Sequence, residues 1–199
     1  DSHRRQRQMC IRDSFEFGSV YRYEKTGVLH GLLRLRGFTQ DDAHIFCTID
    51  QINEEVKTLL SFSINLLRCY GLTEIEADLS TKPKKYIGSD KDWENATSSL
   101  KQSLTELKVP FQTAEGEGAF YGPKIDLHAK DAIGRRWQLS TIQIDFAQPE
   151  NFNIEYVNSD NKKSRPVMIH RALLGSVERF TAVLLEHYAG HLPGWLSPT

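Results

Sequence analysis

The order in which strand-like and helix-like runs follow one another is the feature that most constrains the fold. Helix-like runs, with apolar residues three and four positions apart, are few and are separated by groups of strand-like runs. A doubly wound sheet would instead alternate strands and helices regularly. The sequence therefore predicts an α+β fold, an antiparallel β-sheet core flanked by helices. The strand-like runs occupy residues 16–24, 32–38, 74–80, 111–115, 123–131, 135–146 and 167–173.

Three helices are predicted, two of them with clear boundary signals. Thr48 and Gln51 have the spacing of a capping box at the start of the first helix, and Gly71 follows its end as a stop signal. Pro110 ends the second helix, and the third covers residues 177–188. No internal repeat or low-complexity linker divides the chain, so we expect these elements to share one domain.

Composition excludes several classes of protein. The 199 residues are 39% hydrophobic and 26% charged, with a formal net charge of −1. A nearly neutral chain has no global basic field for nucleic acid, so a nucleotide or nucleic-acid partner would require a local cluster of arginines. No apolar run approaches the roughly 18 residues of a membrane span, and no membrane association is expected. Cys10, Cys47 and Cys69 fit neither a disulfide framework nor a paired-cysteine zinc site, which indicates a reducing compartment.

The N-terminal segment differs from the rest of the chain. Residues 1–14, DSHRRQRQMCIRDS, combine a dense cationic run with little apolar periodicity. Such composition is typical of disorder, which is the favoured interpretation, and the alternative is a segment foreign to the domain that follows. We predict a disordered or foreign segment over 1–14 and a folded domain over 15–199.

A graded row of polar side chains follows the first predicted hairpin. Side chains two positions apart share a face of a strand, and a solvated face is the ordinary interpretation of a polar one. This row instead orders guanidinium, aromatic, amide, carboxylate and imidazole groups. Guanidiniums suit phosphate oxygens, a ring suits a stacked base, and the amide and carboxylate suit an ammonium or hydroxyl group. The order matches a nucleotide joined to an amino acid. The row is Arg34, Arg36, Phe38, Gln40, Asp42 and His44, with Arg22 and Glu24 on the preceding strand.

His170 lies in a predicted apolar strand, PVMIHRALLGSVERF. A histidine in this setting is most often a core residue with a satisfied ring. Together with His44 it could instead supply two of the three protein ligands of a catalytic zinc site. Cys47 has the opposite strand parity from His44, so it is a poor third ligand.

Two glycine-containing segments are further candidates. Gly175 and Ser176 stand at a strand-to-helix junction, where a helix N-terminus favours anions, and Arg179 follows one turn later. Such glycines often only permit close helix packing. The segment GEGAFYGPK could be a flexible hairpin tip, or a loop whose Tyr121 and Lys124 line a pocket.

These segments together resemble a known family. VYRYEKTGVLHGLLRLRGFTQDDAHIF resembles motif 2 of class II aminoacyl-tRNA synthetases. GEGAFYGPKID, RRWQLSTIQIDF and PVMIHRALLGSVERF resemble the threonine-specific strands and motif 3 of the threonyl-tRNA synthetase family. The resemblance covers about residues 15–198, and such length makes it far more specific than a short motif. It implies an incomplete class II catalytic fold.

The resemblance implies an ATP site and catalytic residues. Arg22 and Arg34 would hold the α-phosphate region, and Glu24 would hold the adenine amino group. Phe38 would stack on the adenine, with Arg179 closing the other face. The three arginines would be the catalytic residues, and Mg²⁺ would accompany ATP.

It also implies a zinc and threonine site. His44 and His170 would bind a zinc ion that holds the threonine amino and hydroxyl groups, and Asp42 would accept a hydrogen bond from that hydroxyl. The rest of the amino-acid and adenylate pocket would be lined by Gln40, Tyr121 and Gln138, with Lys124 and Ser176 at its edge.

The implied activity is that of a cytoplasmic threonine–tRNA ligase, which forms threonyl-adenylate and transfers threonine to tRNA(Thr). The family's motif 1, its third zinc ligand (an upstream cysteine) and its anticodon-binding domain have no counterpart among these residues. We therefore expect weak zinc retention and impaired activity for this chain, and homodimerisation in the full-length protein. The alternative is a synthetase-like module that binds ATP and amino acid without aminoacylating.

Overall fold

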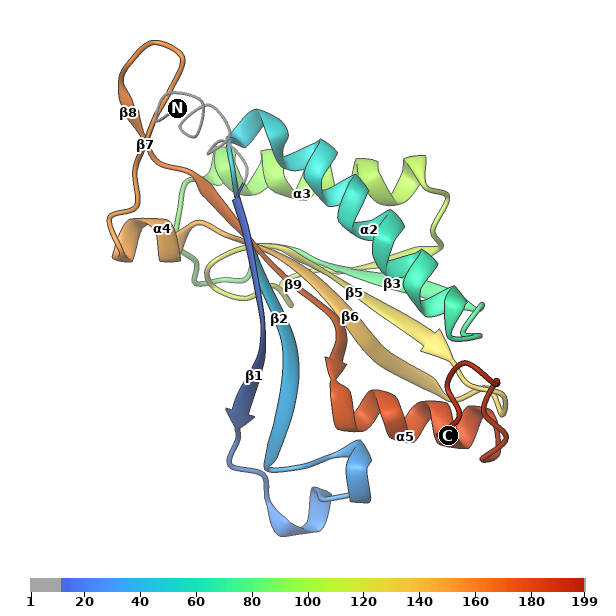
Figure 1. The fold of residues 1–199 in the computed structure, drawn as a ribbon. Helices are drawn as coiled ribbons and strands as arrows, with labels where there is room; N and C mark the ends of the chain where they lie inside the picture. The colour runs from blue at the N-terminus through green and yellow to red at the C-terminus, as the bar shows by residue number, and fades with distance from the viewer. Residues whose placement is uncertain (1–11, 199) are drawn as a thin grey trace.

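A seven-stranded β-sheet forms the centre of the molecule in a computed structural model that describes residues 12–198 (Figure 1). Neighbouring strands pair antiparallel, except for the parallel pair β3–β4 at one edge. The predicted α+β class with an antiparallel core is confirmed. In spatial order the strands are β1 (Arg12–Tyr21), β2 (Gly37–Cys47), β9 (Val167–Ser176), β6 (Arg136–Asp145), β5 (Lys124–Lys130), β3 (Ile75–Ser80) and β4 (Phe111–Ala114).

Helices α2 (Ile52–Cys69) and α3 (Asp90–Glu106) lie along the same side of this sheet (Figure 1). The start of α2 is as predicted, since Thr48 and Gln51 form a capping box ahead of it. Their apolar stripes pack on the inward side chains of the central strands, and burial of this apolar area is the main stabilising contribution. Fully buried members of the core include Val56, Leu60, Leu100, Leu104, Ile125, Leu127, Ile142 and Ile144.

The remaining elements lie at the ends of the sheet. Helix α5 (Val177–His187) follows β9 directly, with Ser176 as its N-cap. A short helix, α4 (Ala147–Asn151), follows β6 and leads to the two-stranded hairpin of β7 (Tyr156–Val157) and β8 (Lys163–Ser164). Within residues 12–198, no helix combines the length and apolar character that crossing a bilayer requires.

The first hairpin differs from its prediction. Strand β1 ends at Tyr21 and β2 starts at Gly37, so the predicted strands at 16–24 and 32–38 are both wrong in part. Two 3-10 turns, Thr26–Val28 and Gly31–Leu33, occupy the connection. The Leu-Arg alternation in LLRLR imitates a strand, but Gly31 has φ +48°, a left-handed conformation that ends regular pairing.

The predicted domain boundary is also too late. Strand β1 begins at Arg12 and pairs with β2 from there, so residues 12–14 belong to the sheet. The predicted disorder of residues 12–14 is therefore wrong, because backbone pairing to β2 does not require apolar periodicity. Residues 1–11 lie outside the described residues.

Candidate active site

A cavity of about 460 Å³ opens on the face of the sheet opposite α2 and α3. Strand alternation creates it, because Ala43, Ile45 and Cys47 of β2 are buried in the core while the intervening side chains face the other way. Phe38, Gln40 and Asp42 of the predicted row therefore line the cavity, whereas His44, the last member of the row, is not among the lining residues. The cavity is lined by Arg22, Glu24, Arg34, Phe38, Gln40, Asp42, Tyr121, Lys124, Gln138, His170, Ser176 and Arg179, all of them predicted site residues.

Three guanidinium groups converge at one end of this cavity. Arg22 lies over the Phe38 ring, 5.1 Å from its centroid, and Arg34 forms a 3.2 Å ion pair with Glu24. Arg179 donates from Nε to the Leu33 carbonyl at 2.8 Å. Burial, then the positive charges of Arg34 and Arg22, lower the pKa of Arg179. Mutual repulsion of this kind is relieved by an anion, so this end of the cavity suits a phosphate group.

Arg36 does not join this group. Its guanidinium donates to the Glu24 carbonyl at 3.0 Å and to Thr26 Oγ1 at 3.4 Å, and it is not among the residues lining the cavity. Arg36 was predicted to belong to the polar row because residues 32–38 were predicted to form a regular strand. The 3-10 turns break that parity, so Arg36 instead braces the loop.

His170 lines the cavity, and His44 lies beside it. His44 and His170 are directly opposite in the β2–β9 pairing, and their ring centroids are 4.8 Å apart. One ligand atom from each of these histidines and one from Asp42 all lie within 4.8 Å of one another. The predicted convergence is confirmed. Two imidazoles and a carboxylate are a donor set that zinc accepts, so these side chains fit the implied metal.

Asp145 supports His170 and was missed by sequence reasoning. Its Oδ2 is 2.7 Å from His170 Nε2, and its Oδ1 accepts hydrogen bonds from the amides of Ala147 and Gln148. The Asp145 side chain is only 2% exposed, so water does not compete with His170 for this hydrogen bond. Metal-binding histidines commonly have a carboxylate on their second ring nitrogen. A carboxylate 25 residues away along the chain gave no local signal for this contact.

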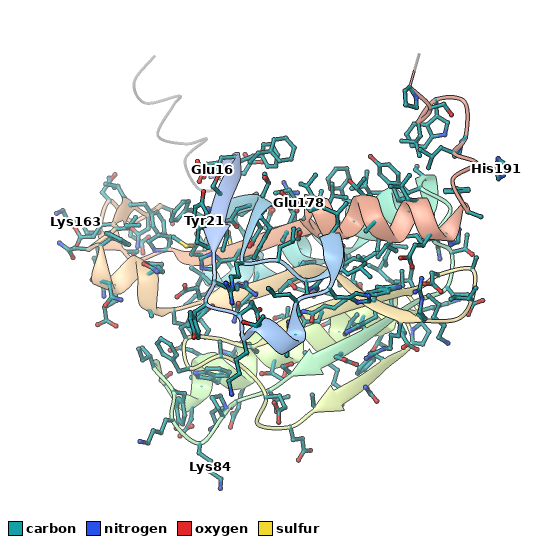
Figure 2. All side chains as sticks on the ribbon, turned by 90° about the horizontal axis from the view of Figure 1, so that it is seen from below. Glu16, Tyr21, Lys84, Lys163, Glu178 and His191 are labelled. Atoms are coloured by element: carbon teal, nitrogen blue, oxygen red, sulfur yellow. The ribbon has the colours of Figure 1, made fainter. Side chains whose placement is uncertain are left out.

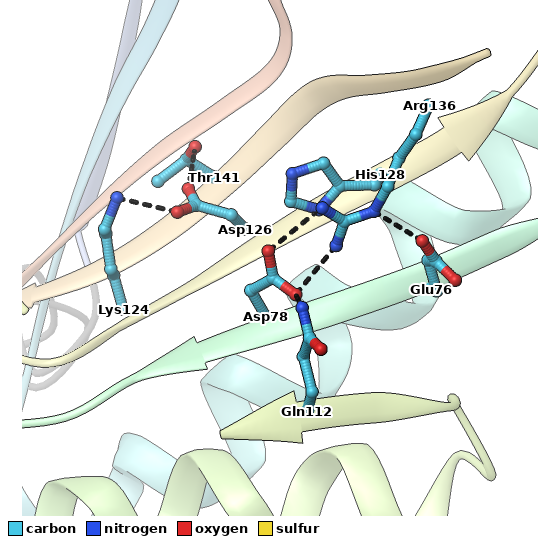
Figure 3. Close-up of polar contacts among 8 residues, drawn as sticks. All are labelled: Glu76, Asp78, Gln112, Lys124, Asp126, His128, Arg136 and Thr141. Carbon is cyan, nitrogen blue, oxygen red and sulfur yellow. Dashed lines mark hydrogen bonds and ion pairs between the residues drawn. The ribbon is translucent and has the colours of Figure 1, made fainter. Parts of the chain in front are cut away.

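The wall between the two ends carries a network of hydrogen bonds (Figure 3). Asp126 Oδ2 lies 2.6 Å from Lys124 Nζ, and Asp126 Oδ1 accepts a 2.7 Å hydrogen bond from Thr141. Tyr121 donates to Gln143 Oε1 at 3.1 Å. Asp126, Thr141 and Gln143 line the cavity but were not predicted. Their alternation along β5 and β6 was a usable signal, since residues two apart share a face.

A bulge explains how Gln138 also reaches the cavity. Leu127 pairs with Ser140, but His128 pairs with Gln138, so Leu139 is an extra residue in β6. Gln138 and Thr141, three positions apart, therefore line the same cavity. Strict alternation would have placed them on opposite faces.

The fold and cavity place the chain in a known class of protein. Residues 4–188 match the family described as tRNA synthetase class II core domain (G, H, P, S and T), and the chain belongs to this family. Individual proteins similar to this chain include threonine–tRNA ligases. The enzyme of Aquifex aeolicus is 60% identical over 185 residues, covering 93% of this chain and 29% of that protein. The enzyme of Streptomyces griseus is 61% identical, with 92% and 28% covered.

Solved structures agree with this grouping. The RNA binding domain of threonyl-tRNA synthetase from Cryptosporidium parvum Iowa II superposes with a TM-score of 0.89 and 46% identity, covering 97% of this chain and 48% of that one. The histidyl-tRNA synthetase of S. aureus, at 16% identity and a TM-score of 0.59 over 89% of this chain and 45% of that one, shows the shared fold alone. The predicted family is confirmed. The chain spans 28 to 29% of the length of the two ligases compared above.

Proposed function

We propose that this chain carries the adenylate-forming site of a threonine–tRNA ligase. The observation that carries the proposal is that three guanidinium groups and the His170 imidazole, which pairs with the His44 ring, converge on one cavity from segments far apart in sequence. The cationic end suits the phosphates of ATP, and the histidine end suits a small amino acid. The identity of 60% to a threonine–tRNA ligase supports threonine as that amino acid.

The reaction needs no side-chain nucleophile. A threonine carboxylate oxygen attacks the α-phosphorus of ATP, the bond to the bridging oxygen breaks, and pyrophosphate leaves with that electron pair. Arg22, Arg34 and Arg179 would stabilise the negative charge that develops on the phosphoryl oxygens. The Phe38 ring, beneath the Arg22 guanidinium, offers a stacking surface for the adenine. Mg²⁺ bound with ATP would supply further charge stabilisation.

His44 and His170 would hold zinc, with the second nitrogen of His170 fixed by Asp145. When bound, the metal would supply a Lewis acid that the threonine amino and hydroxyl groups can ligate. Valine has nearly the same shape but no hydroxyl, and an apolar pocket alone separates such pairs by only about a hundredfold. Asp42, beside the two histidines, would accept a hydrogen bond from the same hydroxyl. These residues would therefore provide the selection against valine.

The proposal also covers the cellular compartment of the protein, its tRNA and its oligomeric state. Cys47 is buried and Cys69 is exposed, and both are free thiols, which supports a reducing, cytoplasmic compartment. Transfer of threonine to tRNA(Thr) and homodimerisation are proposed for the full-length protein on the strength of its family. Light scattering of the full-length protein tests the homodimer directly.

Threonine-dependent exchange of labelled pyrophosphate into ATP tests the proposed chemistry. We expect exchange that depends on threonine, far slower for this chain than for a full-length ligase. Exchange that valine supports equally would contradict the assignment of threonine. ATP binding without any exchange would identify the chain as a synthetase-like binding module.

A further inference from the structure

The pairing between β2 and β9 is interrupted beside the cavity. Gln40 pairs with Ser176, but Asp42 pairs with Ala172. Two steps along β2 therefore match four steps along β9, and Asp41 alone stands opposite residues 173–175. Their backbone groups lose regular partners on β2, and buried N–H groups without partners are costly.

The carboxylate of Asp41 takes the place of those partners. Its Oδ2 accepts a 2.8 Å hydrogen bond from the amide of Leu173. The amide of Leu174 donates to both of its oxygens, at 3.0 and 3.1 Å. Asp41 is 3% exposed, so no solvent competes for these bonds. Burial raises the pKa of Asp41, and the bonds from Leu174 and Leu173 offset part of that rise.

A buried carboxylate at this position requires a reason, because desolvating a charge is expensive. The interrupted segment leads directly to the groups that face the phosphate end of the cavity. Gly175 has φ +70°, and a Cβ placed on it would lie 2.6 Å from the Leu139 carbonyl oxygen. Ser176 then accepts the amide of Arg179 at 3.2 Å, which begins α5. The path of residues 173–175 therefore sets where Arg179 starts.

A second carboxylate fixes the other side of the same junction. Both oxygens of Glu178, in the first turn of α5, accept the amide of Thr39 at 2.9 Å. Figure 2 shows Glu178 where α5 begins, beside the strands of the first hairpin. Thus β2 is tied to α5 on one side of Gln40, through Thr39, and to the end of β9 on the other side, through Asp41. Asp41 is flanked in sequence by Gln40 and Asp42, which line the cavity.

We propose that Asp41 is a positioning residue that holds the phosphate-binding end of the cavity, Ser176 and Arg179, in register with Gln40 and Asp42. This role rests on the proposed function, since it concerns how ATP and amino acid are held together. Asp41 touches neither reactant. It acts through the backbone of Leu173 and Leu174.

The test compares Asp41→Asn with wild type in the 199-residue chain. Asparagine keeps the size but presents an NH₂ group to backbone donors, so at most one oxygen can still accept. We expect the dissociation constant for ATP, measured by titration calorimetry, to rise roughly ten- to a hundredfold. Asp13→Asn, an exposed carboxylate change on β1, is the matched control and should leave the constant unchanged. Circular dichroism at the titration temperature establishes that each variant is folded.

Amide hydrogen exchange supplies a readout that needs no ligand. In Asp41→Asn we expect faster exchange at Leu173, Leu174 and Arg179, with the core amides of α2 unchanged. A folded variant that binds ATP like wild type would overturn the proposal. If wild type itself binds no ATP, the proposed function fails instead. In that case amide hydrogen exchange decides whether Asp41 is a positioning residue. Unchanged protection of the Leu173, Leu174 and Arg179 amides in Asp41→Asn overturns the role, and a loss of protection confined to these amides supports it.

Discussion

His44 and His170, 126 positions apart in sequence, are direct partners in the β2–β9 ladder, with ring centroids 4.8 Å apart. Backbone pairing fixes this relationship, because directly opposite residues of neighbouring strands carry their side chains on the same face of the sheet. Because β2 also carries Phe38, Gln40 and Asp42 on the same face, the imidazole pair is held at a constant distance from the rest of the cavity.

Replacing either histidine should remove the metal-binding capacity of the cavity. For His44→Ala and His170→Ala we expect loss of zinc measured by elemental analysis after equilibration and desalting. Wild type should hold zinc but lose it to mild chelation, because the proposal assigns Asp42 to the threonine hydroxyl and leaves two imidazoles, one protein ligand fewer than a catalytic zinc site usually has. Exposed His191→Ala is the control. Equal zinc content in all four proteins would show that the metal binds elsewhere.

Asp145→Asn should weaken zinc binding without removing a ligand. The carboxylate holds His170 Nε2 at 2.7 Å, and loss of such a partner typically costs ten- to a hundredfold in metal affinity. Competition with a chromophoric zinc chelator measures this change. An unaltered affinity in the folded variant would mean that Asp145 serves only to cap α4 through Ala147 and Gln148.

Arg179→Lys should weaken ATP binding although the charge is kept. Lysine has no planar fork, so it cannot both donate to the Leu33 carbonyl and present parallel donors to a phosphate. We expect an increase of roughly tenfold or more in the dissociation constant for ATP, which corresponds to ~1.4 kcal/mol. Lys85→Arg, an exposed change outside the cavity, should have no effect. If Arg179→Lys also has none, the guanidinium does not contact the nucleotide.

Stability should fall in acid through Asp131, which is far from the cavity. Burial raises the pKa of this carboxyl, but hydrogen bonds from Trp137 and Arg135 outweigh it and lower the pKa to about 2. A depressed folded-state pKa stabilises the protein above the ordinary value of 3.8, and this contribution is lost as the pH falls from about 4 towards 2.

Asp131→Asn should therefore lower the free energy of unfolding at pH 7 by about 2 kcal/mol and reduce its dependence on pH below 4. Urea denaturation at several pH values measures both effects. A variant that loses stability equally at pH 7 and pH 2 would show that packing, and not ionisation, accounts for the change.

Local patterns in the sequence predicted the parts of the site that depend on one strand or one helix. The row from Phe38 to His44 follows from a period of two, and the start of α2 follows from Thr48 and Gln51. Arg34 also lines the cavity, although the strand predicted for residues 32–38 is wrong in part.

What escaped prediction depends on pairing between strands. The bulge that brings Gln138 and Thr141 together, and the interruption opposite Asp41, arise from the registers of β6 with β5 and of β9 with β2. Asp145 contacts His170 only because β6 and β9 are neighbours. A single sequence carries no direct record of such register shifts, since each is set by tertiary packing.

Binding of a non-hydrolysable sulfamoyl analogue of threonyl-adenylate tests the central claim most directly, because it requires both ends of the cavity at once and no turnover. In the presence of zinc, calorimetry should show one site per chain, with the valyl analogue bound at least about a hundredfold more weakly. Equal affinity for the two analogues, or no binding of the threonyl analogue to the folded chain, would contradict the account.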